Sequence, residues 1–406
     1  MKNEKLLDAI GQIDDELIFD AVSNTKPEKK NNLFKWGILA AACLVAVITA
    51  FTIPLLHKTP EKTDIDANLP LLTISENQGA AMGFEGYMAY DISELVNANP
   101  WNETMTLSTL PVYENPLSYD NNFIVSGADF DAMKASLTDI ATRLGMDMDT
   151  LEITDNTPSE EYKAAVLSKT DGDIPEGYFN PTKVIAENNG IEIEVETDMT
   201  AVISFEPAIS LPEQYNFSHY ASYEDTAAVA GYLNIQYEDF INMKNPQVNI
   251  HGGDYNIYSQ QSYGIEFFDV GGSDPERIVN YNFNRVAFYC DDSGSLFLAR
   301  VFQPDLSHKT GDYPVISADD ARELLLSGNY ITTVPYAMPG ENYIAKTELV
   351  YRTGKYDQYY MPYYRFYVEL PEAEREGGLK TYGAYYVPAV LSSYISNMPV
   401  WDGSFN

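Results

Sequence analysis

The chain has 406 residues, with 25 Lys and Arg against 60 Asp and Glu, which gives a formal net charge of -35 at pH 7. This balance argues against nucleic-acid binding, which needs clustered Lys and Arg, and it disfavours attraction to anionic lipid head groups. Apolar residues make up 45% of the chain, so most of it is expected to fold. Two cysteines cannot make a disulfide framework, and four histidines leave little for a zinc site.

A charge-free run from Trp36 to Leu56, WGILAAACLVAVITAFTIPLL, predicts one transmembrane helix. At 1.5 Å per residue a run of this length crosses a hydrocarbon core of about 30 Å. The alternatives are a cleaved signal peptide or a buried core helix, but the apolar stretch of a signal peptide is usually roughly 7–15 residues long. Here the run is longer and follows a segment with a helical pattern of its own, so we expect a retained anchor.

The charges beside this run predict its orientation. Four lysines precede the run closely, whereas only Lys58 and Lys62 follow it closely. The positive-inside rule therefore places the N-terminus in the cytoplasm and the large C-terminal part outside the cell membrane. The expected segments are a cytoplasmic helix and basic linker (1–35), the span (36–56), an extracellular stalk (57–80), an α+β ectodomain with two helix-plus-strands units (81–310) and a third such unit (311–406).

The cytoplasmic segment has an apolar stripe with three- and four-residue steps, typical of an amphipathic helix. The stripe comprises Leu6, Leu7, Ile10, Ile13, Leu17 and Ile18. An isolated helix this short cannot bury that face by itself, and its acidic residues disfavour an anionic membrane surface. We therefore favour a protein partner over a free tail.

The string EKLLDAIGQIDDELIFDAV, followed by a Lys-rich linker and one span, resembles the start of single-pass proteins of clostridia-type bacteria. Many of these are anti-sigma factors or accompany extracytoplasmic-function sigma factors. The resemblance implies that the six stripe residues grip a sigma factor or another signalling protein. It covers about the first 56 residues only. Typical anti-sigma domains have several helices and many carry a His and Cys zinc motif, whereas residues 1–35 predict one helix and contain neither residue type.

The residues after the stalk predict an α+β fold in which helices pack on one face of antiparallel sheets. A short strand leading into a helical turn at Ile92 and an extended piece at 110–114 come first. Helices are expected over 130–144, from Ser222 to 237 and after Ser317, and a hairpin over 183–197 turns at Asn188-Asn189-Gly190. Further strands are expected near 201–205, 247–250, 255–260, 263–269, 279–290, 295–303, 348–351, 363–370 and 382–390.

The last unit, with LVYRTGKYDQYYMPYYRFYV and then YGAYYVPAV, resembles PepSY-like modules over roughly residues 315–395. Those modules are generally non-catalytic, so the resemblance implies binding. On the strand at 363–370, Tyr363, Arg365 and Tyr367 face one way. One interpretation is sheet packing with phenol tips in water, and the other is an aromatic surface for a sugar, a peptide or another ectodomain. These three residues are the predicted extracellular contact.

Motifs of common enzymes are absent from the sequence, including G-x-S-x-G, H-E-x-x-H, Walker A and the Rossmann glycine pattern. Cys290 alternates with Tyr289 in a strand pattern and has no His or Lys beside it in the sequence, so a core position is expected rather than a nucleophile. We therefore predict no catalytic residue, no cofactor and no metal. The expected function is that of a membrane-anchored regulator or sensor, and the alternative is a passive envelope adaptor anchored by its N-terminal segment. An enzyme comes third.

Overall fold

The structure is a computed structural model that describes residues 68–75, 85–120, 123–170, 174, 177–354, 356–375 and 377–403. The chain divides into two compact units, Met1–Ile65 and Asp66–Asn406, and every described residue belongs to the second. The predicted span at 36–56 and the helix at its N-terminal side therefore lie outside the described residues. Within the described ranges, no helix combines the length and apolar character needed to cross a membrane.

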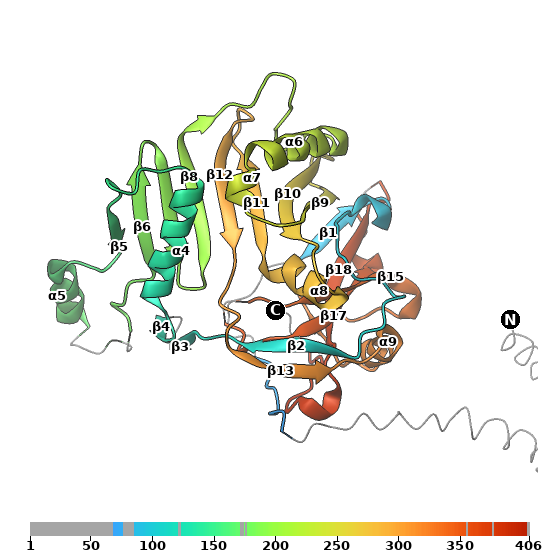
Figure 1. Ribbon diagram of the computed structural model, residues 1–406. Helices are drawn as coiled ribbons and strands as arrows, with labels where there is room; N and C mark the ends of the chain where they lie inside the picture. Colours follow the sequence, from blue (N-terminus) through green and yellow to red (C-terminus); the bar gives the residue numbers. More distant parts are fainter. Residues whose placement is uncertain are drawn as a thin grey trace, which may run out of the picture. The chain divides into compact units, whose positions relative to one another are not determined.

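The second unit is a mixed α/β structure built mostly of antiparallel sheets, as the sequence predicts (Figure 1). Its largest sheet has eight strands, all paired antiparallel with their neighbours. In sheet order these are β5 (Ile153–Asp155), β6 (Lys183–Asn188), β7 (Ile191–Glu196), β8 (Thr200–Ile209), β12 (Leu296–Phe302), β11 (Arg285–Cys290), β10 (Gln261–Asp269) and β9 (Pro246–Tyr255). The sequence predicted two separate helix-plus-strands units in this region. Their strands belong to one sheet, because β8, the last strand of the first unit, pairs with β12, the last strand of the second.

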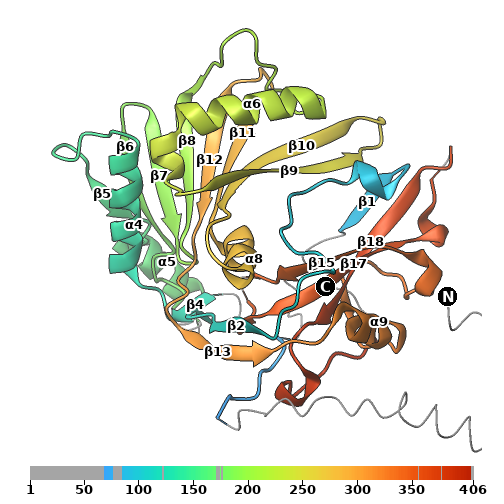
Figure 2. The ribbon, with the colours of Figure 1, turned by 45° about the vertical axis from the view of Figure 1, so that its right-hand side comes forward.

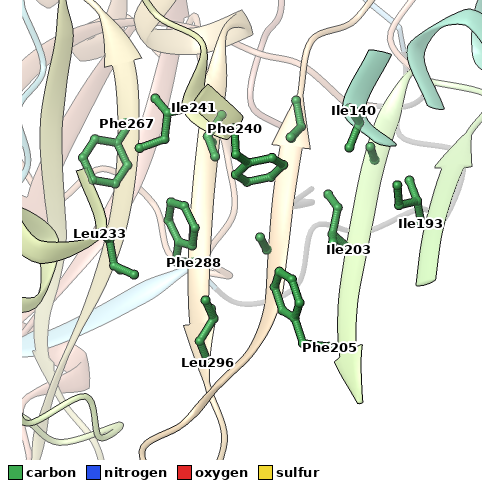
Figure 3. Packing of buried hydrophobic residues seen from close by; sticks show 14 of the residues in the cluster. Ile140, Ile193, Ile203, Phe205, Leu233, Phe240, Ile241, Phe267, Phe288 and Leu296 are labelled. Atoms are coloured by element: carbon green, nitrogen blue, oxygen red, sulfur yellow. The ribbon is translucent and has the colours of Figure 1, made fainter. Parts of the chain in front are cut away.

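Helices cover one face of this sheet (Figures 1 and 2). They are α4 (Phe130–Arg143), α6 (Tyr223–Gln236) and α7 (Glu238–Ile241). Helix α4 contacts β6 and β7, and α6 contacts β9 and β10. The predicted cap of α6 is confirmed, since the Ser222 side chain accepts a hydrogen bond from the Asp225 N–H. Strand and helix side chains such as Ile203, Phe240, Phe267 and Phe288 pack together beneath the helices (Figure 3).

The two faces of the eight-stranded sheet differ in polarity because side chains alternate along each strand. In β11, Val286, Phe288 and Cys290 are buried in the cluster under the helices. The core position predicted for Cys290 is thereby confirmed. Arg285, Ala287 and Tyr289 alternate with them and line a cavity on the opposite face, which carries none of the three covering helices.

A second sheet of five strands is built mainly from the C-terminal residues. It comprises β1 (Gly86–Ala89), β18 (Lys380–Pro388), β17 (Pro362–Glu369) and β15 (Ile344–Tyr351) in that order, with β14 (Ile331–Thr332) also paired to β18. Helix α9 (Ala318–Leu326) begins at the expected Ser317 cap and packs on β18. Strand β1 and the 3-10 turn at Ile92–Glu94 agree with the expected strand and turn.

Smaller elements complete the described part. A three-stranded sheet pairs β13 (Lys309–Pro314) with β2 (Thr109–Glu114) and β2 with β16 (Tyr359–Tyr360). Strands β3 (Ser118–Asp120) and β4 (Phe123–Ser126) form a ladder, and α5 (Glu160–Lys169) stands apart from the buried clusters. Strand β1 pairs with β18, and β2 pairs with β13, so the residues before 115 pack with the C-terminal strands. The boundary expected between the second and third units, at 310, falls within β13.

Two expected strands are wrong. Residues 256–260 form the turn between β9 and β10, because the Asn256 side-chain oxygen accepts hydrogen bonds from the N–H groups of Tyr258 and Gln260. The expected strand at 279–290 begins as a helix, α8 (Asp274–Phe283). The signal missed was Ser273 three residues before Glu276, whose carboxylate accepts hydrogen bonds from the Ser273 N–H and hydroxyl. Helix α8 contacts β10, β11 and β15, so it packs against both sheets (Figure 2).

The turn between β6 and β7 yields a stability prediction. Asn189 and Gly190 both have positive φ, and a Cβ on Gly190 would meet the carbonyl oxygen of Glu206, whose N–H donates to Gly190 O at 2.7 Å. We expect Gly190→Ala to lower the free energy of unfolding by about 2–4 kcal/mol, from backbone strain and overlap together. The control Gly145→Ala also has positive φ but open space around the new methyl group, and should cost about 1 kcal/mol. Equal losses in urea unfolding would contradict this turn geometry.

Candidate functional site

The predicted contact residues of the last unit lie inside the protein. Strand β17 is flanked by β15 and β18, and Tyr363 and Tyr367 are 3% and 5% exposed. Arg365 between them has a side chain that is 16% exposed. The exposed aromatic surface expected on this strand is therefore not formed by these tyrosines, because other residues cover both faces of the strand. The six stripe residues of the predicted cytoplasmic helix lie outside the described residues.

Arg365 belongs to a buried ionic cluster centred on Glu348 of β15. The Glu348 side chain is 3% exposed and accepts hydrogen bonds from Arg365 Nη2 at 2.6 Å and Arg365 Nε at 3.2 Å. Its other oxygen contacts Lys346 Nζ at 2.8 Å and accepts from Asn97 Nδ2 at 2.8 Å. Burial by itself would raise the pKa of Glu348, but the charges of Arg365 and Lys346 outweigh it and lower the pKa to about 2. The carboxylate is therefore ionised and fully paired.

The ionic cluster continues to the other side of Arg365. The Arg365 guanidinium lies 5.1 Å from the centre of the Tyr367 ring and 3.8 Å from Glu85 Oε1. The Glu85 carboxylate accepts hydrogen bonds from the hydroxyls of Tyr87 at 2.6 Å and Tyr386 at 2.8 Å. These contacts join polar groups from β1, β15, β17 and β18. The strands of the five-stranded sheet are therefore linked by a network of hydrogen-bonded and paired charges.

Residues 97–99 connect this cluster to the eight-stranded sheet. The Asn97 side chain donates to Glu348. The backbone N–H of the next residue, Ala98, donates to Asn249 Oδ1 of β9 at 2.8 Å. Asn99 Nδ2 then donates to the carbonyl of Leu349 on β15 at 3.1 Å. Three consecutive residues thus hold β9 of one sheet and β15 of the other at a fixed spacing.

A cavity of about 290 Å³ lies at this junction. Its wall includes Arg365 and Tyr367 from β17, Tyr281 from α8 and residues of β9 and β10. This volume is near the lower end of the range for small-molecule sites. A neighbouring cavity of about 230 Å³ shares Glu266 and Arg285 with it, so both cavities lie along the polar face of the eight-stranded sheet.

The groups in these walls carry both signs of charge. Glu266 accepts hydrogen bonds from Asn249 at 3.1 Å and from Arg285 Nη1 at 3.4 Å, and His251 Nε2 lies 4.0 Å from it. Within the described part, Arg285 Nε and Thr200 Oγ1 are buried without a hydrogen-bond partner. Such an arrangement can hold a small polar ligand that carries both donors and acceptors.

A larger cavity of about 580 Å³ lies at the start of α8 and includes Lys244, Lys309 and Asp312 in its wall. We consider it the weaker candidate. The carboxylate of Glu276 occupies the first turn of the helix and places negative charge where an anion would bind, and Lys309 is already paired with Asp312 at 2.8 Å.

Cys290 has a neighbour that the sequence did not reveal, because His219 Nδ1 lies 3.7 Å from its sulfur. No His lies beside Cys290 in the sequence, but His219 lies beside it in space. Burial nevertheless raises the pKa of the thiol, and Asp291 and Asp292 raise it further. A raised pKa lowers the fraction of thiolate, which is the form of Cys that acts as a nucleophile. Among the residues that the structure describes, no group of three or more His, Cys, Asp or Glu is placed to hold a metal ion.

The junction residues Asn97, Asn249, Glu266 and Arg285 were missed at the sequence level. Their polarity and strand alternation are readable, but the strand pairing that brings them together is not. No family model matches the chain, and no curated protein is significantly similar to it in sequence. The resemblances to anti-sigma factors and to PepSY-like modules therefore stay predictions.

The ionic cluster predicts how stability depends on pH. The pKa of Glu348 falls from an ordinary 4.5 to about 2 on folding, so its contribution is complete above about pH 4.5 and is lost as the pH falls through 2. That difference corresponds to about 3 kcal/mol. Glu348→Gln leaves Arg365 buried without its carboxylate, and we expect a loss of about 3–5 kcal/mol at pH 7 in urea unfolding.

The control for this experiment is Glu187→Gln, which changes an exposed carboxylate of β6. It should alter unfolding by less than about 0.5 kcal/mol. Between pH 5 and pH 2.5 the native chain and the control should lose stability in parallel, whereas Glu348→Gln should lose less. Parallel loss in all three proteins would show that Glu348 is not the group responsible.

Proposed function

We propose that this chain is a membrane-anchored, non-catalytic regulator or sensor. The α+β unit lies outside the cell and binds a ligand or partner, and the N-terminal helix contacts a transcription or signalling protein in the cytoplasm. The observation that carries the proposal is the order of segments along the chain. A short amphipathic segment, a charge-free run from Trp36 to Leu56 and a large acidic folded unit follow one another. This order is typical of proteins that couple the two sides of a membrane.

The cavity at the junction supports a sensing role for the outer unit. Its wall combines Arg365 and Tyr367 of the five-stranded sheet with His251 and Glu266 of the eight-stranded sheet. A ligand that contacts both sheets favours the spacing at which both sets of contacts form. Ligand binding in this cavity would thus stabilise the arrangement in which the two sheets meet.

The cytoplasmic side of the proposal rests on the stripe of apolar residues from Leu6 to Ile18. That stripe has the spacing of a helix face that enters a groove on another protein. In this role the chain resembles an anti-sigma factor, with one helix in place of a multi-helix domain. The alternative of a passive envelope adaptor keeps the outer unit's binding role and gives the stripe no partner.

Surface labelling tests the orientation. In a Cys43→Ser background, where Cys290 is buried, Glu372→Cys places a thiol on the exposed 3-10 turn Pro371–Ala373 of the outer unit, and Asn24→Cys places one before the span. We expect a membrane-impermeant maleimide to label Glu372→Cys on intact cells and to leave Asn24→Cys unlabelled until the cells are lysed. Labelling of Asn24→Cys alone on intact cells would reverse the orientation and refute the proposal.

Co-purification tests the cytoplasmic contact. The full-length chain, cross-linked in cells and purified from membranes, should bring down a sigma factor or signalling protein. Ile10→Asp with Leu17→Asp should reduce recovery at least tenfold, because two charges would enter an apolar contact. The control Asp8→Asn with Glu16→Gln changes the polar side of the same segment and should leave recovery unchanged. Equal recovery with all three proteins, or no specific partner for the native chain, would favour the adaptor.

A further inference from the structure

Exposed aromatic side chains gather at a place that the sequence did not single out. Tyr90 follows β1, Tyr220 lies in the turn before the Ser222 cap, Tyr223 begins α6, and Ile257 and Tyr258 lie in the turn between β9 and β10. Their exposed fractions are 53%, 54%, 47%, 69% and 75%. We refer to these five residues as the tyrosine surface.

Contacts between the three segments place these residues near one another. The Tyr90 and Tyr255 rings lie 5.3 Å apart, and the Tyr223 and Tyr263 rings lie 5.6 Å apart. Tyr255 and Tyr263 both belong to the β9–β10 hairpin, which therefore supports Tyr90 as well as Tyr223. At the tip of the hairpin, Asn256 Nδ2 lies 3.4 Å from the Tyr220 hydroxyl. Three chain segments that are distant in sequence thus present their aromatic side chains together.

The charges around the tyrosine surface are almost all negative. The three contributing segments, 85–97, 216–225 and 253–263, contain no Lys or Arg. They contain six carboxylates; Glu85 is paired with Arg365 in the ionic cluster, and the others are Asp91, Glu94, Glu224, Asp225 and Asp254. Glu94 accepts a hydrogen bond from the Tyr255 hydroxyl at 3.0 Å, which places one carboxylate among the rings. The neighbouring cation Lys380 is already paired with Glu369 at 2.9 Å.

Aromatic faces beside carboxylates are the chemistry that recognises cationic side chains. A guanidinium or ammonium group is attracted to the face of a Tyr ring within about 6 Å, and a nearby carboxylate adds a charge-assisted hydrogen bond. A net charge of -35 also attracts a basic partner at long range. We propose that the tyrosine surface binds an Arg- and Lys-rich segment of a partner protein outside the cell.

Other occupants fit the surface less well. A second copy of the chain would bring two acidic surfaces into contact, which like-charge repulsion opposes. An anionic membrane surface is repelled by the same charges. A neutral sugar could stack on the rings but would gain little from the carboxylates. The inference rests on the proposed function, in which the outer unit binds a partner, and it goes further by giving the place and the partner's chemistry.

The test uses the full-length chain in detergent micelles and a fluorescent oligo-arginine peptide as the probe. Tyr220→Ser with Tyr258→Ser keeps the net charge and changes only exposed side chains, so the fold should be unaffected in thermal unfolding. Loss of two cation–aromatic contacts should weaken binding about tenfold. The control Tyr162→Ser with Leu167→Ser removes exposed apolar side chains of α5 instead and should bind like the native chain.

The remaining outcomes overturn the inference in distinguishable ways. Equal binding by the native chain and by Tyr220→Ser with Tyr258→Ser would mean that the peptide responds to overall charge alone. Dimerisation in sedimentation that is lost in the same variant, without peptide binding, would assign the surface to a second copy. Binding of neutral cell-wall glycan fragments, but not of oligo-arginine, would assign it to sugars. None of these outcomes affects co-purification through residues 1–35, so the proposed function is tested separately.

Discussion

Burial of the Glu348 carboxylate is the constraint around which the described unit is organised. An ionised carboxylate that is 3% exposed must be matched by cations and donors that are already in place, because water cannot reach it. Arg365 and Lys346 supply the charge, and Asn97 supplies a donor from the segment between β1 and β2. Satisfying this one group therefore fixes the side chains of β15 and β17 and the path of residues 97–99 together.

That path in turn determines where the two sheets meet. The eight-stranded sheet uses its apolar face for the core beneath α4, α6 and α7, which leaves its polar face for the junction with the five-stranded sheet. Polar residues on this face, among them Asn249, Glu266 and Arg285, would be costly to bury against an apolar layer. They are accommodated because the opposing layer contributes Arg365 and because cavities remain between the layers. The candidate ligand cavity follows from the same polarity that builds the fold.

Local patterns in the sequence predicted much of this fold. The caps at Ser222 and Ser317 and the Asn189-Gly190 turn depend on side-chain and backbone chemistry within a few residues, and all three were placed correctly. Helix α8 was taken for a strand because its apolar residues lie in a short segment joined to β11, although its Ser273–Glu276 signal was readable.

The candidate site was much harder to predict. Alternation along β17 correctly places Tyr363 and Tyr367 on one face, but it cannot show that β15, β18 and the residues around them bury that face. The tyrosine surface was missed for the converse reason. Tyr90, Tyr220 and Tyr258 lie in turns and loops far apart in the sequence, so only the folded chain shows that they are neighbours. Strand alternation therefore offered an aromatic surface on β17, whereas the exposed tyrosines lie in segments that no local pattern brings together.

Hydrogen–deuterium exchange gives the most direct test of the proposal that the described unit binds a basic partner. The full-length chain in lipid nanodiscs would be compared with and without a saturating Arg-rich peptide. The account predicts slower exchange at residues 219–224 and 255–261, which carry most of the tyrosine surface, and unchanged exchange in α5. Slower exchange confined to α5 and the neighbouring strands β5 and β6, or no local change despite bound peptide, would contradict it.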